Sequence, residues 1–216
     1  MLLNLDQIHY HQGTDFTCGP CSLMMGLSVL KPGYEPNDLD EMLIWREANT
    51  VFMGSGHAGC SPYGLARAAM RRRLKAEIWQ WNAKNLFSSW TRNPTHRLAM
   101  KTMMTHDQTR AEEEGAVIQE GRWDYRELRK ALSVNRLALV LTSDGIEAHW
   151  MLAAIPAGQK DIVLVDPQPD ETFDYQKIIR PTPRRFNQLI SYGRENTRVA
   201  VLLSRRRGNS AGTAQK

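Results

Sequence analysis

Residues 12–21 read Gln-Gly-Thr-Asp-Phe-Thr-Cys-Gly-Pro-Cys, a polar turn that leads directly into the apolar segment 22–30. The leucines of that segment recur at three- and four-residue spacing, which predicts a buried helix over Cys18–Leu30. The cysteine therefore lies in the first turn of the helix. The rest of the fold is expected to pack around this helix.

A thiol at the start of a helix is placed for nucleophilic chemistry. Unpaired backbone N–H groups and the positive end of the helix dipole favour an anion there, so Cys18 is expected to ionise readily. Gln12 precedes it by six residues, close enough for its amide to fold back beside the cysteine. Gln12 and the Cys18 backbone N–H are then candidate donors to an oxyanion.

A nucleophilic thiolate needs a base, and two candidate partners occur late in the chain. Short apolar runs at 137–141, 149–155 and 162–165 are separated by turn residues, which predicts an antiparallel meander. His149 opens the second strand and Asp166 follows the third. A hairpin between these strands brings the two side chains to the same end of the sheet.

These motifs carry a resemblance to a known family. Gln12-x5-Cys18-Gly19-Pro20 at a helix start, then His149-Trp150 and Asp166-Pro167, resembles the papain-like cysteine peptidases. In particular, residues 5–203 are similar to the bacteriocin-leader-processing branch, family thirty-nine, and to its bacterial peptidase-like subgroup. Further landmarks of that subgroup are Phe16-Thr17-Cys18-Gly19-Pro20, Trp45-Arg46-Glu47-Ala48 and Ser55-Gly56-His57-Ala58-Gly59-Cys60-Ser61-Pro62.

The resemblance implies an α+β papain-like fold, with N-terminal helices packed on an antiparallel sheet. It implies that Cys18 is the nucleophile, His149 the general base, Asp166 the orienting acid and Gln12 the oxyanion donor. It also implies a substrate cleft near Cys18, with these substrate-binding residues: Gly19, His57, Gly59, Cys60 and Trp150. The predicted function is hydrolysis of a peptide or amide bond without a cofactor.

Other functions remain open. Papain-like sites also transfer acyl groups to amines, and a protein can keep the fold only to bind a peptide. Cys18-x2-Cys21 together with His57-x2-Cys60 has the ligand types and spacing of a structural zinc site. A redox role for Cys18 and Cys21 is disfavoured because the thioredoxin-like strand, turn and helix are lacking.

The remaining segments predict further elements. Asn37 caps a helix over Asp38–Arg46, Ser61 begins a helix to Arg73, and residues 84–115 form a methionine-bearing helical insertion. Four tryptophans are candidates for an apolar specificity pocket: Trp79, Trp81, Trp90 and Trp150. The other expected elements are strands over 5–11, 75–81 and 198–203, a helix over 123–132 capped by Asp124, and a helix over 182–190 opened by Thr182 and Pro183.

Composition limits the class of protein. The chain of 216 residues is 42% hydrophobic, enough for one core, so we expect a single domain over 1–203 and a disordered basic tail over 204–216. No secretory signal or membrane span is evident, and three cysteines suit a reducing cytoplasm. The net charge of +5 is spread between the tail and a helix end, which argues against nucleic-acid binding. The oligomeric state is not predicted.

Overall fold

The computed structural model describes residues 5–49, 59–87, 91–143, 147–168 and 176–206. The helices are α1 (Leu5–Ile8), α2 (Cys18–Leu30), α3 (Asp38–Ala48), α4 (Pro62–Arg71), the 3-10 turn η2 (Ala83–Asn85), α5 (Pro94–Glu113), α6 (Tyr125–Ala131) and α7 (Pro183–Leu189). The strands are β1 (Leu74–Trp81), β2 (Val117–Glu120), β3 (Arg136–Ser143), β4 (Ala148–Ala154), β5 (Val163–Val165), β6 (Ile178–Ile179) and β7 (Arg198–Arg205).

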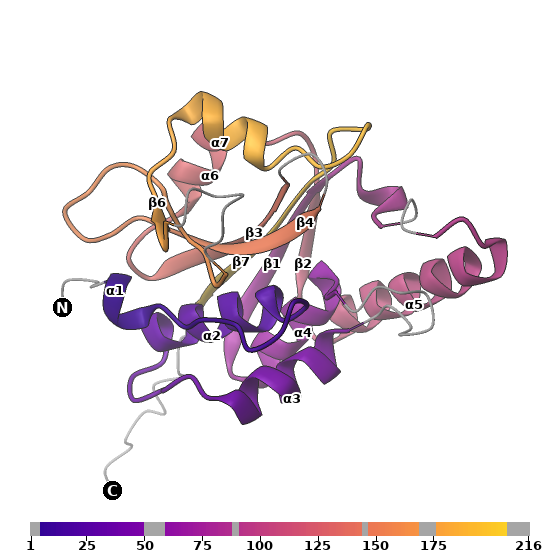
Figure 1. Cartoon of the computed structure of the whole chain (residues 1–216), viewed down its shortest axis with the longest axis horizontal. Coiled ribbons are helices and arrows are strands. Elements are labelled where there is room, and N and C mark those ends of the chain that lie inside the picture. Colours follow the sequence, from indigo (N-terminus) through magenta and orange to yellow (C-terminus); the bar gives the residue numbers. More distant parts are fainter. Residues whose placement is uncertain (1–4, 50–58, 88–90, 144–146, 169–175, 207–216) are drawn as a thin grey trace, which may run out of the picture.

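A sheet in the order β2-β1-β7-β3-β4-β5-β6 forms the middle layer of the described chain. α2, α3, α4 and α5 lie on one side of it, and α6 and α7 lie on the other (Figure 1). Two apolar clusters fill the spaces between these layers, one against α2 and α4 and the other against α6 and α7. The protein is therefore an α+β fold with the sheet buried on both faces.

The predicted meander is confirmed. β3 and β4 are antiparallel, with Thr142 opposite His149, and β4 and β5 are antiparallel, with Leu152 opposite Val165. The expected helix over Cys18–Leu30 is α2, with the bounds predicted from the sequence. The sequence thus predicted both elements that carry the candidate nucleophile and base.

The sheet is mixed, so the expectation of a purely antiparallel sheet was wrong. β1 and β2 are parallel, with Glu77 opposite Val117, whereas the other pairs are antiparallel. Parallel neighbours need a long crossover connection, and α5 provides it between β1 and β2. Beyond that, β2 and β6 are strands that the sequence analysis did not predict.

The strand expected over residues 5–11 was also wrong. Residues Leu5–Ile8 form the single helical turn α1. Leu5 and Ile8 are three residues apart and therefore share one face of that turn, where both pack against the core beside α2. In a strand, Leu5 and Ile8 would point to opposite faces. A helical turn is favoured because it buries both side chains on one side.

Side-chain caps fix the starts of several helices as predicted. Asn37 accepts a hydrogen bond from Asp40 N, Ser61 from Gly64 N, and Thr182 from Arg185 N. Asp124 and Glu127 form a reciprocal capping box at α6. Because these contacts span only two or three residues, they could be read from the sequence.

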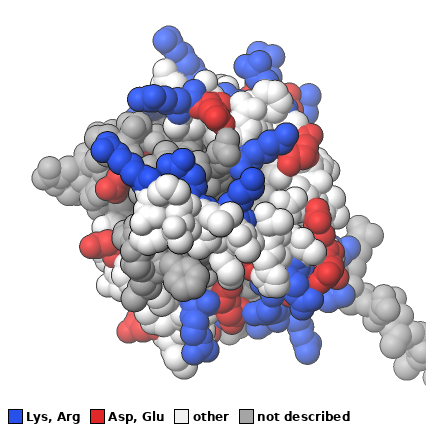
Figure 2. Space-filling model, turned by 90° about the vertical axis from the view of Figure 1, so that its right-hand side faces the viewer, with Lys and Arg blue, Asp and Glu red and all other residues white. Residues whose placement is uncertain are grey.

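The segment predicted as a helical insertion contains α5, a single helix of 20 residues. Met100 is buried in the core below it, and Met104 packs partly against the same core. Arg67 of α4 ties α5 in place by ion pairs to Asp107 and Glu114. Figure 2 faces the side on which α5 projects, where Lys and Arg side chains stand out with Asp and Glu among them.

The C-terminal strand β7 continues to Arg205, two residues past the strand expected over 198–203. Residues 207–216 of the expected tail lie outside the described residues. No helix in the described part of the chain is both long and apolar enough to cross a bilayer.

Candidate active site

Cys18 is the first residue of α2, and Thr17 occupies the N-cap position before it. The helix start is closely packed. A Cβ added at Gly19 would lie 3.2 Å from Leu65 Cδ2 and 3.3 Å from Cys60 Cβ, so only a very small residue fits without displacing its neighbours. The start of α2 is therefore held tightly against α4 and the segment around Cys60.

The side chains of His149 and Asp166 lie next to each other, as expected from the predicted hairpin. His149 is the second residue of β4, and Asp166 immediately follows β5. His149 Nε2 lies 2.7 Å from Asp166 Oδ1, and the carboxylate is completely buried. The same oxygen accepts a hydrogen bond of 2.8 Å from Gln168 N, so the acid is fixed from two directions.

The Cys18 thiol and the His149 imidazole are hydrogen-bonded to each other. Burial alone would raise the pKa of Cys18, but the hydrogen bond and charge of His149 outweigh it and hold that pKa below its ordinary value. Burial alone would lower the pKa of His149, but bonds to Asp166 and Cys18 raise it to about 10. Both shifts favour a thiolate paired with an imidazolium.

α2 and β4 are joined beside this pair. Ser22 Oγ donates to Trp150 O at 3.0 Å, and the backbone of Trp150 also hydrogen-bonds the Cys18 thiol. The indole of Trp150 is buried and donates to Cys60 O at 3.1 Å. Trp150 therefore supports the walls of the site from within the core.

Gln12 lies beside the segment that follows Asp166. Gln12 N donates to Pro167 O at 2.9 Å. Its side-chain amide donates to Thr14 O at 2.7 Å and also to Gln168 Oε1. An amide nitrogen carries two hydrogen atoms, so both are engaged in this arrangement. An oxyanion would have to replace one of these acceptors.

The other predicted substrate-binding residues do not all face a cleft. Cys60 is buried against Gly19, and Gly59 is half-buried beside it. His57 lies outside the described residues, as does Trp90. Trp79 and Trp150 pack in different core clusters on opposite sides of the sheet, so these two do not share a specificity pocket.

The hypothesis of a zinc site receives no support from the described residues. Among them, no three His, Cys, Asp or Glu side chains are grouped as metal ligands, and the three cysteines are unbridged thiols. Burial raises the pKa of both Cys21 and Cys60, so these two thiols stay protonated. Cys18 is thus set apart from the other two cysteines by its lowered pKa.

Two polar residues that the sequence analysis passed over also contact the site. Gln168 bridges Asp166 and Gln12 through its backbone and its side chain. Glu41 of α3 is buried below the turn that carries Gln12 and Cys18. A signal for Glu41 was present in the sequence, since it falls on the same helical face as the buried Ile44 and Ala48.

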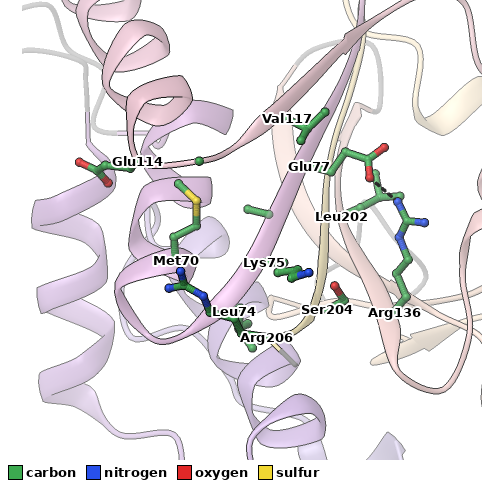
Figure 3. A pocket seen from close by; sticks show the side chains of 12 residues that line it. Met70, Leu74, Lys75, Glu77, Glu114, Val117, Arg136, Leu202, Ser204 and Arg206 are labelled. Carbon is green, nitrogen blue, oxygen red and sulfur yellow. Dashed lines mark hydrogen bonds and ion pairs between the residues drawn. The ribbon is translucent and has the colours of Figure 1, made fainter. Parts of the chain in front are cut away.

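Two cavities lie away from the catalytic pair. The one in Figure 3 has a volume of about 420 Å³ and is lined by residues that include Lys75, Arg136 and Ser204. Arg136 begins β3, whereas His149 pairs with Thr142, six residues further along that strand and thus about 20 Å away at the usual rise. A second cavity, of about 470 Å³, lies between α5 and Tyr63 of α4.

The model of the family described as "Peptidase_C39 like family" matches residues 8–204, which covers nearly the whole described chain. The match includes every residue of the candidate site. No curated protein matches the sequence.

Proposed function

Since this chain belongs to the Peptidase_C39 like family, we propose that it is a cysteine peptidase of papain-like fold that cleaves a peptide or amide bond. The observation that carries the proposal is the hydrogen-bonded series from Asp166 through His149 to Cys18. The opposite pKa shifts of Cys18 and His149 support a reactive thiolate in the resting protein.

The acylation step uses each member of this series. The Cys18 thiolate attacks the carbonyl carbon, and the carbonyl oxygen becomes an oxyanion. His149 Nε2 is bonded to Asp166, which leaves Nδ1 as the ring nitrogen that serves Cys18. When the C–N bond breaks, imidazolium gives its proton to the leaving amine and the acyl group stays on the sulfur as a thioester.

Water completes the reaction. Neutral His149 takes a proton from the attacking water, a second oxyanion forms, and its collapse releases the acid and restores the thiolate–imidazolium pair. The Cys18 backbone N–H lies at a helix start, where it has no partner within the helix, and it donates to the oxyanion. Gln12 donates as well once it exchanges its bond with Gln168 for one to the oxyanion.

Alkylation of the purified, metal-free protein tests this proposal. We expect limiting iodoacetamide to modify Cys18 selectively at pH values below about 8.5, the ordinary thiol pKa, and mass spectrometry locates the modified residue. His149→Ala should slow the reaction at pH 7 by tenfold or more. Cleavage of a peptide library by the wild type, lost in Cys18→Ala, then establishes the peptidase activity.

Two results would contradict the peptidase proposal. One is a Cys18 that reacts no faster than Cys21 or Cys60. The other is equal protection of all three cysteines by added zinc, which would favour the metal-site alternative instead.

A further inference from the structure

The side chain of Glu41 is a buried carboxylate that the proposed mechanism does not use. It is 1% exposed, and it lies on the face of α3 that also buries Ile44 and Ala48. Burial of a carboxylate is costly unless its oxygens accept good hydrogen bonds. Its partners therefore indicate why it is there.

Those partners lie at the two ends of one turn. Glu41 Oε1 accepts a hydrogen bond of 2.8 Å from Gly13 N and another from the Thr17 hydroxyl. Gly13 directly follows Gln12, and Thr17 directly precedes Cys18. One carboxylate oxygen thus holds together both ends of the segment that separates the two oxyanion donors. The Cys21 thiol, one turn into α2, also bonds to Glu41.

The other acidic residues of α3 have different partners. Asp38 accepts a bond from Tyr10 OH at 2.6 Å, and Asp40 accepts one from Tyr34 OH at 2.8 Å. Glu47, near the end of α3, pairs with Arg72 at 2.9 Å. Within the described residues, no cation forms an ion pair with Glu41. Its contacts are therefore directed at the turn.

We propose that Glu41 is a positioning residue that sets the geometry of the oxyanion site, an inference that rests on the proposed peptidase function. An oxyanion donor acts only when it lies at hydrogen-bond distance from the developing charge. Glu41 fixes the two residues that adjoin the donors, Gly13 and Thr17. Its third partner, the Cys21 thiol, lies on α2 together with Cys18.

The Cys18–His149 pair is held by other contacts than those of Glu41, so thiolate formation and oxyanion binding can be tested separately. Ser22 joins α2 to β4, and Asp166 holds His149 from the other side. Loss of Glu41 is therefore expected to displace the oxyanion donors while the Cys18–His149 pair stays formed. This difference can be measured with two small reagents that need no knowledge of the natural substrate.

Iodoacetamide and p-nitrophenyl acetate report on different parts of the site. With iodoacetamide, a sulfur–carbon bond forms as the carbon–iodine bond breaks, and no oxyanion arises. With p-nitrophenyl acetate, the thiolate attacks the ester carbonyl, a tetrahedral oxyanion forms, and its collapse leaves a thioester and releases p-nitrophenolate. The ratio of acylation rate to alkylation rate therefore isolates the oxyanion site.

The test compares this ratio in Glu41→Gln, in Thr17→Val and in the control Glu47→Gln. Glu41→Gln keeps the shape of the side chain but removes its charge. Thr17→Val removes the hydroxyl that donates a hydrogen bond to Glu41. We expect both to lower the ratio about tenfold or more, with alkylation changed by less than about twofold. Glu47→Gln changes an acid of the same helix that bonds elsewhere, and should leave the ratio unchanged.

The outcomes separate the two proposals. Rapid alkylation of wild-type Cys18 with an unchanged ratio in Glu41→Gln overturns the role of Glu41 alone. An equal loss of both rates in a variant that folds also overturns it, because general damage would then explain the effect. Slow alkylation of the wild type overturns the peptidase function itself. If Glu41→Gln does not fold, Thr17→Val decides by the same criteria.

Discussion

The candidate site depends on two side chains whose pKa values move in opposite directions. The thiol of Cys18 is shifted down and the imidazole of His149 is shifted up to about 10. Cys18 is therefore ionised above its lowered pKa, and His149 stays protonated up to about pH 10. Between these limits the thiolate and the imidazolium exist together, which is the form that the proposed reaction needs.

The pH dependence of alkylation follows from these shifts. As pH rises, the rate should increase through the pKa of Cys18, with a midpoint below about 8.5. In His149→Ala the neighbouring positive charge and hydrogen bond are gone while burial remains, so the midpoint should move to higher pH. Stopped-flow alkylation between pH 4 and 10 measures both midpoints. A wild-type midpoint at or above 8.5 would contradict the pairing.

The role of Asp166 can be measured on the imidazole directly. Asp166→Asn removes the negative charge 2.7 Å from His149 Nε2, so we expect the pKa of His149 to fall from about 10 toward its ordinary value of about 6.5. Titration of the ring protons by NMR gives that pKa, with the wild type as the reference. An unchanged imidazole pKa would mean that Cys18 alone holds the charge.

At the scale of helices, α3 and α4 approach each other very closely. A Cβ added at Gly64 would lie 2.4 Å from Ala48 O and 2.7 Å from Ala48 Cα, which are backbone atoms with little freedom to move. The crossing of these helices therefore requires glycine at this position. Since α3 carries Glu41 and α4 packs beside Cys18, the crossing also sets the position of the candidate site.

Gly64→Ala is accordingly expected to lower the free energy of unfolding by at least about 2 kcal/mol. Gly26→Ala in α2 is the matched control, because its added Cβ would meet Leu203 Cδ1 at 3.5 Å, an ordinary contact. Urea denaturation of the two variants and the wild type gives the comparison. Equal effects of the two substitutions would argue against this helix crossing.

The attachment of α5 depends on Arg67. Its ion pair with Asp107 is largely buried, with side-chain exposures of 13% and 11%. Arg67→Met keeps the apolar stem but leaves Asp107 without its partner, so we expect a loss of about 2 kcal/mol of stability. Arg110→Met removes a solvent-exposed pair with Glu113 and should cost less than about 0.5 kcal/mol in the same denaturation assay. A similar loss of stability in both variants would mean that the Arg67–Asp107 pair does not attach α5 to α4.

At the scale of the whole molecule, the centre of the sheet is the most protected part. β7 pairs with β1 on one side and with β3 on the other, and helices cover both of its faces. β2 is an edge strand of only four residues, none of which is fully buried. Opening of the edge should therefore cost much less free energy than opening of the centre.

Hydrogen exchange measured by mass spectrometry tests this order. The amides of β3 and β7 should exchange slowest, at rates near those of global unfolding, and those of β2 should exchange fastest among the strands. Equal protection of β2 and β7 would indicate that another surface covers the edge strand.

The sequence by itself determined the elements that depend on near neighbours. The start of α2 at Cys18, the caps Asn37 and Asp124 and the meander that carries His149 were all predicted. Each depends on residues a few positions apart, whose spacing or turn chemistry favours one local conformation. The family followed from the same short motifs.

Tertiary structure alone decided which distant segments meet. β7 lies between β1 and β3, β2 runs parallel to β1, and Gln168 reaches Gln12 across 156 positions of sequence. Local propensity does not select among such pairings, because their free energy depends on burial of the whole sheet between two helical layers. For the same reason Glu41 reads in sequence as one acid near a helix start, and only the packing of α3 under residues 13–17 gives it a partner at each end of the turn.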